Sequence, residues 1–289
     1  MRPTRWTPVE NQAVRRAVVT DAPQQREEAI ASMPRGGPDA SWLDRRLQTQ
    51  ALEYLDRDDV SDEVKQRVIR TLDRIGTLSK QHEKYARAAL SVVSDVPNPR
   101  ILELGAGHGK LSEQILMMHP TATVTVTDLD PTSLANITAG PLGDHPRAVA
   151  QLIDATEIDA ADQSYDLVVF ALTFHHLPPV IACRAIAEAT RVGRRFLVVD
   201  LKRRNPFAVL LTTVVMLPIN ALFWLWPATR PAVHDGFISA LRAYSLSALR
   251  ALGHAADPSL RLDQLTPPTR FGPPLTSVVY SRARSESAR

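Results

Sequence analysis

Residues 100–110 constrain the fold more than any other part of the chain, because three glycines alternate between an apolar run and a helical pattern. These glycines, Gly105, Gly107 and Gly109, have a G-x-G-x-G spacing that follows the acidic Glu103. Glycine tolerates positive φ and lets the backbone approach a ligand closely. A glycine turn between a strand and a helix makes a pocket lined by backbone N–H groups. The spacing differs from the G-x-G-x-x-G of dinucleotide binders, which favours a nucleoside with an amino-acid-like tail over a pyrophosphate.

Runs of strand-forming residues recur downstream and end near carboxylates. The β-branched run 123–128 ends in Asp128, and the run 149–155 contains Asp154. Two further apolar runs follow, at 165–172 and 195–200. Ligands of open parallel sheets bind at the carboxyl ends of the strands, where an acidic side chain accepts hydrogen bonds from ribose hydroxyls. We therefore expect Asp128 to lie at a nucleoside site.

In order and spacing these segments resemble the class I S-adenosylmethionine-dependent methyltransferase family, over roughly residues 95–205 and on to residue 282. Residues 103–109 resemble the first motif of that family, and Asp128 falls where the family places its ribose-binding acid. Asp154-Ala155 resembles the pair that meets the adenine ring. The segment 164–169, followed by His175-His176-Leu177, resembles the fourth motif. Residues 191–195 lack the proline of the family's common Pro-Gly-Gly turn, a departure that concerns turn geometry and not chemistry.

The resemblance implies an α/β fold, with a Rossmann-like, mostly parallel seven-stranded sheet that ends in an antiparallel hairpin. It implies S-adenosyl-L-methionine as the cofactor and a set of residues that bind it. Those residues are Glu103, Gly105, Ala106, Gly107, Gly109, Asp128, Leu129, Asp154, Ala155 and Ala171. The implied activity is methyl transfer to an O, N or C nucleophile of a hydrophobic small molecule, such as a natural product or a lipid-like compound. A peptide or protein N-methyltransferase and an NAD-binding or non-catalytic Rossmann protein are the alternatives.

Five further residues, at three places in the chain, are candidates for catalysis or substrate binding. His175 or His176 follows the fourth strand and could transfer a proton, since imidazole titrates near neutral pH, or could simply form a pocket wall. His234-Asp235 either faces the substrate cavity beside these histidines or caps a helix that begins at Ile238. Tyr85 either leans into the cofactor pocket or belongs to the core.

The remaining patterns divide the chain into a helical N-terminal layer (1–94), the nucleoside-binding core (95–205), a hydrophobic helical insertion (206–237), a final helix and closing hairpin (238–282) and a tail (283–289). In the N-terminal layer, apolar spacing predicts an amphipathic helix over 41–56 and a second helix from Ser61 toward Ala89. We expect this layer to cover the cofactor pocket.

The run Phe207–Trp226 contains no charged residue. As a helix it would reach about 30 Å, the thickness of a bilayer core. A single crossing would, however, separate two parts of one sheet, and Pro218 interrupts a straight helix. Three interpretations of this run remain open: it forms a substrate lid, a patch that rests on a membrane, or an extra pair of core helices.

Composition excludes several classes of protein. With 44% hydrophobic and 22% charged residues the chain is globular, and its net charge of +3 is too small and too dispersed for a nucleic-acid surface. The single Cys183 fits a reducing cytoplasm, and no Cys/His spacing indicates a metal site. The polar first 30 residues do not read as a signal peptide. We expect a cytoplasmic protein, with or without peripheral membrane contact through 207–226, and nothing indicates its oligomeric state.

Overall fold

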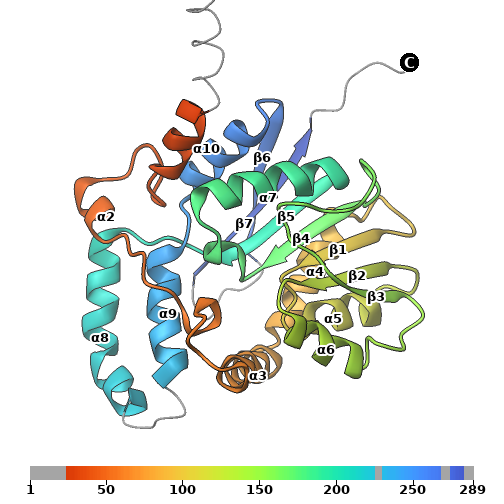
Figure 1. The fold of residues 1–289 in the computed structure, drawn as a ribbon, viewed down its shortest axis with the longest axis horizontal. Helices are drawn as coiled ribbons and strands as arrows, with labels where there is room; N and C mark the ends of the chain where they lie inside the picture. Colours follow the sequence, from red (N-terminus) through yellow and green to blue (C-terminus); the bar gives the residue numbers. More distant parts are fainter. Residues whose placement is uncertain (1–23, 225–229, 268–273, 283–289) are drawn as a thin grey trace, which may run out of the picture.

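A single sheet of seven strands organises the computed structural model, which describes residues 24–224, 230–267 and 274–282 (Figure 1). The strands are β1 (Arg100–Leu104), β2 (Thr123–Asp128), β3 (Ala148–Leu152), β4 (Leu167–Ala171), β5 (Arg195–Leu201), β6 (Leu260–Leu265) and β7 (Leu275–Arg282). Their order is β3-β2-β1-β4-β5-β7-β6. The first five are parallel, and β7 lies antiparallel between β5 and β6. The predicted sheet and its closing hairpin are confirmed.

Helices pack on both faces of this sheet (Figure 1). One face holds α4 (Gln81–Val92), α5 (Lys110–Met118) and α6 (Pro131–Ala139), and the other holds α7 (Pro179–Val192) and α10 (Leu246–Ala256). Alternate residues of a strand serve the two faces: Val168 and Phe170 pack with α7, whereas Leu167 and Val169 pack with α4 and α5. Strands buried on both faces read as continuous apolar runs, which is why the sequence showed them clearly.

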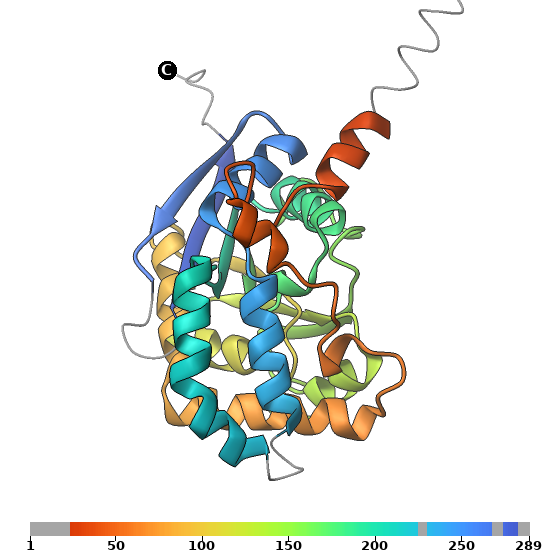
Figure 2. The same ribbon diagram turned by 90° about the vertical axis from the view of Figure 1, so that its left-hand side faces the viewer.

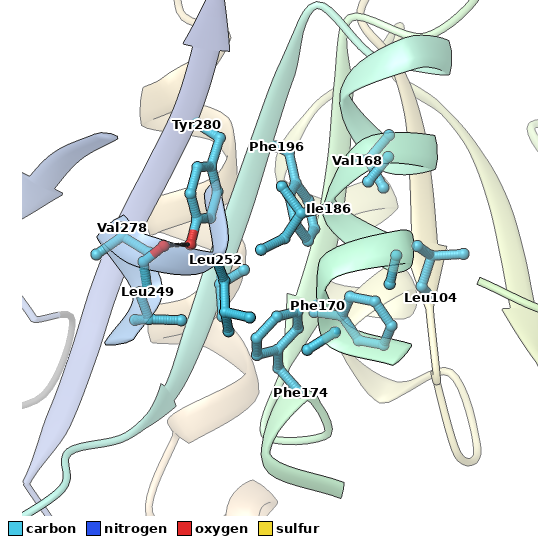
Figure 3. Close-up of a cluster of buried hydrophobic side chains, with 14 of the residues drawn as sticks. Leu104, Val168, Phe170, Phe174, Ile186, Phe196, Leu249, Leu252, Val278 and Tyr280 are labelled. Carbon is cyan, nitrogen blue, oxygen red and sulfur yellow. Dashed lines mark hydrogen bonds between the residues drawn. The ribbon is translucent and has the colours of Figure 1, made fainter. Parts of the chain in front are cut away.

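Aromatic rings fill the core on the α7 and α10 side (Figure 3). Phe196 stacks on Tyr280 with ring centroids 5.7 Å apart, and Phe170 meets Phe174 edge to face. The Tyr280 hydroxyl is fully buried and donates to the carbonyl of Leu249 over 2.8 Å. This hydrogen bond ties β7 to α10 without leaving a polar group unpaired.

The N-terminal region departs from the prediction of a helix over 41–56. The structure has only a short α2 (Trp42–Arg46) and a 3-10 turn η1 (Tyr54–Asp56), with extended chain between them. Trp42 is exposed and Glu53 is buried, the reverse of what an amphipathic helix requires. Contacts with distant elements override local spacing here, since the backbone N–H of Tyr54 donates to Asp235 over 2.9 Å.

The second predicted N-terminal helix is interrupted. It forms as α3 (Asp62–Leu78) and α4, which are separated at Lys80, a residue with φ of 56°. The left-handed conformation of Lys80 turns the chain, so α3 lies across the carboxyl edge of the sheet while α4 packs beneath it (Figure 1).

The hydrophobic insertion is a pair of antiparallel helices beside the sheet, α8 (Pro206–Trp224) and α9 (Arg230–Arg242) (Figures 1 and 2). The prediction of one final helix that begins at Ile238 is therefore wrong, because α9 already contains residue 238 and α10 begins anew after the N-cap Ser245. The predicted boundary between the hydrophobic insertion (206–237) and the final segment (238–282) falls inside α9.

Over residues 206–218, the part of α8 whose side chains the structure describes, the apolar side chains are largely uncovered. The exposed ones are Phe207, Leu210, Leu211, Val214, Val215, Met216 and Leu217, with Phe207 at 77%. An extra pair of core helices would bury these residues, so that alternative is wrong. Within the part of the chain that the structure describes, no helix is long and apolar enough to cross a membrane.

Candidate functional site: the glycine loop and a buried histidine cluster

The glycine loop connects β1 to α5 with three residues of positive φ, Gly105 (63°), Gly107 (57°) and Gly109 (72°). A side chain is excluded at Gly105, where a Cβ atom would lie 2.9 Å from Oγ1 of Thr173. Oγ1 of Thr173 is buried and has no hydrogen-bond partner among the described residues. The loop thus brings close-packed backbone and one unsatisfied hydroxyl to the carboxyl edge of the sheet.

Asp128, at the end of β2, holds the loop in this shape. Its Oδ2 accepts from the backbone N–H of Gly107 over 2.8 Å, and its Oδ1 accepts from that of Asp130 over 2.9 Å. Burial raises the pKa of Asp128, while these two backbone N–H groups oppose the rise. An ionised carboxylate accepts about four hydrogen bonds, so Asp128 keeps acceptor capacity for hydroxyl donors.

Glu103 lies fully buried beneath the loop. Its Oε2 accepts from the backbone N–H of Ser112 over 3.1 Å and from the hydroxyl of the same residue. Burial raises the pKa of Glu103 to about 7, against the opposing effect of Ser112. Glu103 therefore anchors the start of α5 to β1 from within the core.

The other predicted cofactor residues lie around the same edge. Asp154 follows β3 and is exposed, and its Oδ1 accepts from the backbone N–H and the hydroxyl of Thr156, each over 2.8 Å. The backbone N–H of Ile153 donates to the carbonyl of Asp128, which keeps the ends of β2 and β3 together. The side chain of Leu129 is exposed. Ala106, Ala155 and Ala171 are half-buried against the core.

Helix α3 covers the loop. His108 hydrogen-bonds Asp73 through Nδ1 over 2.6 Å and Gln66 through Nε2 over 2.7 Å. Gln66 in turn donates to Asp130, and Ile69 lies 3.4 Å from the Cβ position of Gly107. The N-terminal region thus contacts the loop directly.

A second polar site lies in the turn η2 (Phe174–His176), which follows β4. Nδ1 of His175 lies 2.7 Å from Asp200, and Nδ1 of His176 lies 2.8 Å from Asp56. Burial alone would lower the pKa of His175, but Asp200 and Glu53 more than offset it and raise that pKa to about 9. A buried, ion-paired imidazole of this kind is poorly suited to accept a proton near neutral pH.

Glu53 is the residue that both imidazoles face. It is 2% exposed, and its carboxylate lies 3.6 Å from Nε2 of His175 and 3.6 Å from Nε2 of His176. Ser239 donates to its Oε2 over 2.8 Å. Arg242 bonds to Asp56 and lies 3.9 Å from Glu53. We refer to Glu53, Asp56, His175, His176 and Asp200 as the histidine cluster.

His234 and Asp235 lie beside this cluster. The alternative that they cap a helix beginning at Ile238 is wrong, because both lie inside α9. Asp235 bonds to His234 over 2.9 Å and fixes the backbone of Tyr54, next to Glu53. Tyr85, by contrast, is 4% exposed within the core beneath the sheet, as the core alternative required.

Sequence reasoning missed the acidic members of the histidine cluster. Glu53 and Asp56 were assigned to a helix that does not form, and Asp200 was noted only as the end of a strand. The position of Asp200, at the carboxyl end of β5 beside β4, was the one signal that could have placed it near His175.

Comparison with known proteins agrees with the fold and the loop. Residues 101–195 match a family described as a methyltransferase domain. Together with the strand order and the glycine loop, this match defines a class I S-adenosylmethionine-dependent methyltransferase fold. Over this core the chain is similar to that family, as the motifs predicted.

Two curated relatives are similar over the same region. A malonyl-[acyl-carrier protein] O-methyltransferase of Geobacter sulfurreducens is 34% identical over 104 residues, 36% of this chain and 38% of the relative. An uncharacterized methyltransferase of Mycobacterium tuberculosis is 29% identical over 122 residues, 42% of this chain and 47% of the relative. The chain spans less than half the length of these relatives.

Solved structures extend the likeness in fold. The plantazolicin methyltransferase BpumL, in complex with SAH, superposes with a TM-score of 0.56 at 12% identity, over 90% of this chain and 98% of its own. The mitomycin 7-O-methyltransferase MmcR gives a TM-score of 0.51 at 18% identity, over 72% of this chain and 55% of its own. Both support the methyltransferase fold and lend no support to the NAD-binding alternative.

Proposed function

We propose that this chain transfers a methyl group from S-adenosylmethionine to an O, N or C nucleophile of a hydrophobic small molecule. The observation that carries the proposal is the contact between Asp128 and Gly107, in a loop of three positive-φ glycines at the carboxyl edge of β1 and β2. Such an edge is where nucleosides bind in open parallel sheets.

The residues around the loop fit the cofactor. Backbone groups of residues 105–109 would bind the methionine portion, and Glu103 would fix that loop beneath the ammonium end. Asp128 has acceptor capacity left for the two ribose hydroxyls. We assign the adenine amino group to Asp154 and the faces of the ring to Leu129 and Ala155.

The cofactor supplies a sulfonium methyl that is already a strong electrophile. The protein therefore needs mainly to hold the acceptor in line, with its nucleophilic atom about 3 Å from the methyl carbon, and to exclude water. Holding two reactants in this way supplies much of the acceleration, because effective molarities of well-oriented groups are large. His176 is the better candidate for a proton-transfer role, since His175 is more deeply buried and more tightly ion-paired.

The exposed apolar face of α8 supports a hydrophobic acceptor. An uncovered stripe of this kind is unusual on a water-exposed helix and marks a surface that meets apolar material. The same face supports peripheral contact with a membrane from which a lipid-like acceptor would be drawn. A peptide acceptor is the alternative, and the experiments must distinguish it from a hydrophobic small molecule.

Calorimetry with S-adenosylhomocysteine tests the cofactor assignment. Wild-type protein should bind it, whereas NAD should give no heat of binding and no thermal stabilisation. Asp128→Ala should weaken binding at least tenfold. Asp144→Ala removes the same charge from an exposed position in the loop after α6 and should bind as wild type does. Equal affinities of the two variants would contradict the role of Asp128.

Transfer of a tritiated methyl group into a cell lysate tests the acceptor. Label that extracts into organic solvent and resists protease would support a hydrophobic small molecule. Label that precipitates with acid and is released by protease would instead establish the peptide alternative.

A further inference from the structure

The histidine cluster brings three potential metal ligands to one point. One ring nitrogen of His175, one of His176 and a carboxylate oxygen of Glu53 all lie within 4.8 Å of one another. Glu53 directly precedes η1, whereas the two histidines belong to η2, far away in the chain. Spacing along the sequence therefore did not indicate this site, and we revise the expectation that the chain holds no metal site.

The two imidazoles are oriented as metal ligands usually are. Each engages a carboxylate through Nδ1, His175 with Asp200 and His176 with Asp56, so each turns Nε2 toward Glu53. Histidines that bind metals typically donate their other ring N–H to a carboxylate, which fixes the tautomer and the plane of the ring. The rings lie 4.4 Å apart, centre to centre.

The distances around Glu53 suit a shared cation better than direct hydrogen bonds. Both imidazole nitrogens lie 3.6 Å from the carboxylate, which is too long for an N–H···O bond. Tetrahedral bonds of about 2.0–2.1 Å place neighbouring ligand atoms about 3.3 Å apart, close to the 3.6 Å from Nε2 of His175 to Oε1 of Glu53 and from Nε2 of His176 to Oε2. Oε1 of Glu53 is buried and has no hydrogen-bond partner among the described residues, an arrangement that is costly unless something occupies the space.

The charge of the histidine cluster also favours a bound cation. Within the described residues, Glu53, Asp56 and Asp200 bring three negative charges to the imidazoles, and Arg242 brings one positive charge to Glu53 and Asp56. As metal ligands both imidazoles would be neutral, so these four charged side chains would carry a formal charge of −2, which one divalent cation balances. Such a concentration of buried charge is otherwise strongly unfavourable.

We propose that Glu53, His175 and His176 bind one divalent transition-metal ion of the zinc class. Two imidazole nitrogens and one carboxylate oxygen are ligands that zinc accepts, and three protein ligands leave a fourth position for water or a substrate atom. Asp56 and Asp200 are positioning residues for the two histidines. The ion would fasten the segment around η1 to the carboxyl ends of β4 and β5. This inference does not depend on the proposed methyl transfer, but it would replace the proton-transfer role of His176, because an imidazole bound to metal through Nε2 and to Asp56 through Nδ1 accepts no proton.

Metal analysis of the untagged full chain tests the proposal. Protein purified from zinc-supplemented cells without chelator should retain about one zinc per chain after dialysis, and a chromophoric chelator should compete for it. Replacement by Co²⁺ should give the visible absorption of a four-coordinate nitrogen and oxygen site. Folded wild-type protein that holds no stoichiometric metal in either experiment would overturn the proposal.

Variants locate the site, with circular dichroism to establish that each is folded. Glu53→Gln and His176→Ala should lose stoichiometric zinc. Asp56→Asn should retain the ligands but weaken binding about 10–100-fold. His254→Ala removes an exposed imidazole from α10 and should bind zinc as wild type does. Zinc binding that survives in folded Glu53→Gln, or that falls equally in His254→Ala, would also overturn the assignment.

Discussion

Replacing Glu103 with glutamine should change how the stability of this fold depends on pH. Glu103 is buried and its pKa is raised from 4.5 to about 7, mainly by that burial. Between pH 4.5 and 7 the folded state therefore keeps a proton that the unfolded state releases, and stability falls as pH rises through this window. At about 1.4 kcal/mol per pH unit, the loss attributable to Glu103 is about 3 kcal/mol, complete above pH 7.

Glu103→Gln keeps the acceptor for Ser112 and removes the titration. Its extra amide donor lowers the free energy of unfolding by an amount that does not depend on pH. We therefore ask how the difference in unfolding free energy between the variant and wild type changes with pH. Relative to wild type, the variant should gain about 3 kcal/mol between pH 4.5 and pH 8. Urea denaturation followed by far-ultraviolet circular dichroism measures this free energy of unfolding.

A surface control makes the Glu103 experiment specific. Glu157→Gln repeats the chemical change at an exposed residue after β3 and should follow wild type at every pH. If plots of unfolding free energy against pH for Glu103→Gln and wild type stay parallel to within about 1 kcal/mol, the argument that burial of Glu103 penalises its ionisation is refuted.

Three further changes test other features. Tyr280→Phe should cost about 1 kcal/mol of unfolding free energy, because it removes the buried hydrogen bond to Leu249; unchanged urea stability would contradict this. Gly105→Ala should cost about 1–3 kcal/mol from positive φ alone, and contact with Thr173 should further weaken binding of S-adenosylhomocysteine in calorimetry. Leu211→Lys on α8 should reduce sedimentation with liposomes while leaving stability within about 0.5 kcal/mol, whereas Leu78→Lys on α3 should sediment as wild type does.

The sheet and the glycine loop were predictable because local patterns determine them. Residues such as Val168 and Val169 are buried on both faces of β4, so the strand appears as an unbroken apolar run. Gly105 and Gly107 occupy backbone conformations that other residues rarely adopt, which makes their spacing a direct sign of the turn.

The histidine cluster was not predictable, because long-range contacts form it. Apolar spacing over 41–56 favoured a helix, yet Glu53 is held by residues of η2 and α9 that lie more than 120 positions away. His175 and His176 were visible as a pair, but a single sequence does not show which acids face them. The exposure of α8 was equally hidden, since an uncharged run fits a buried helix and a surface helix alike.

The position of β7 affects how this protein is made. Since β7 pairs with both β5 and β6, and contributes Val278 and Tyr280 to one core cluster and Val279 to the other, both layers stay incomplete until residues 275–282 have been translated. A polypeptide that is truncated before residue 275 lacks β7, so the edges of β5 and β6 stay unpaired and apolar surface stays uncovered. Chaperones should therefore hold this polypeptide almost to the end of its synthesis, and truncated translation products should be degraded quickly.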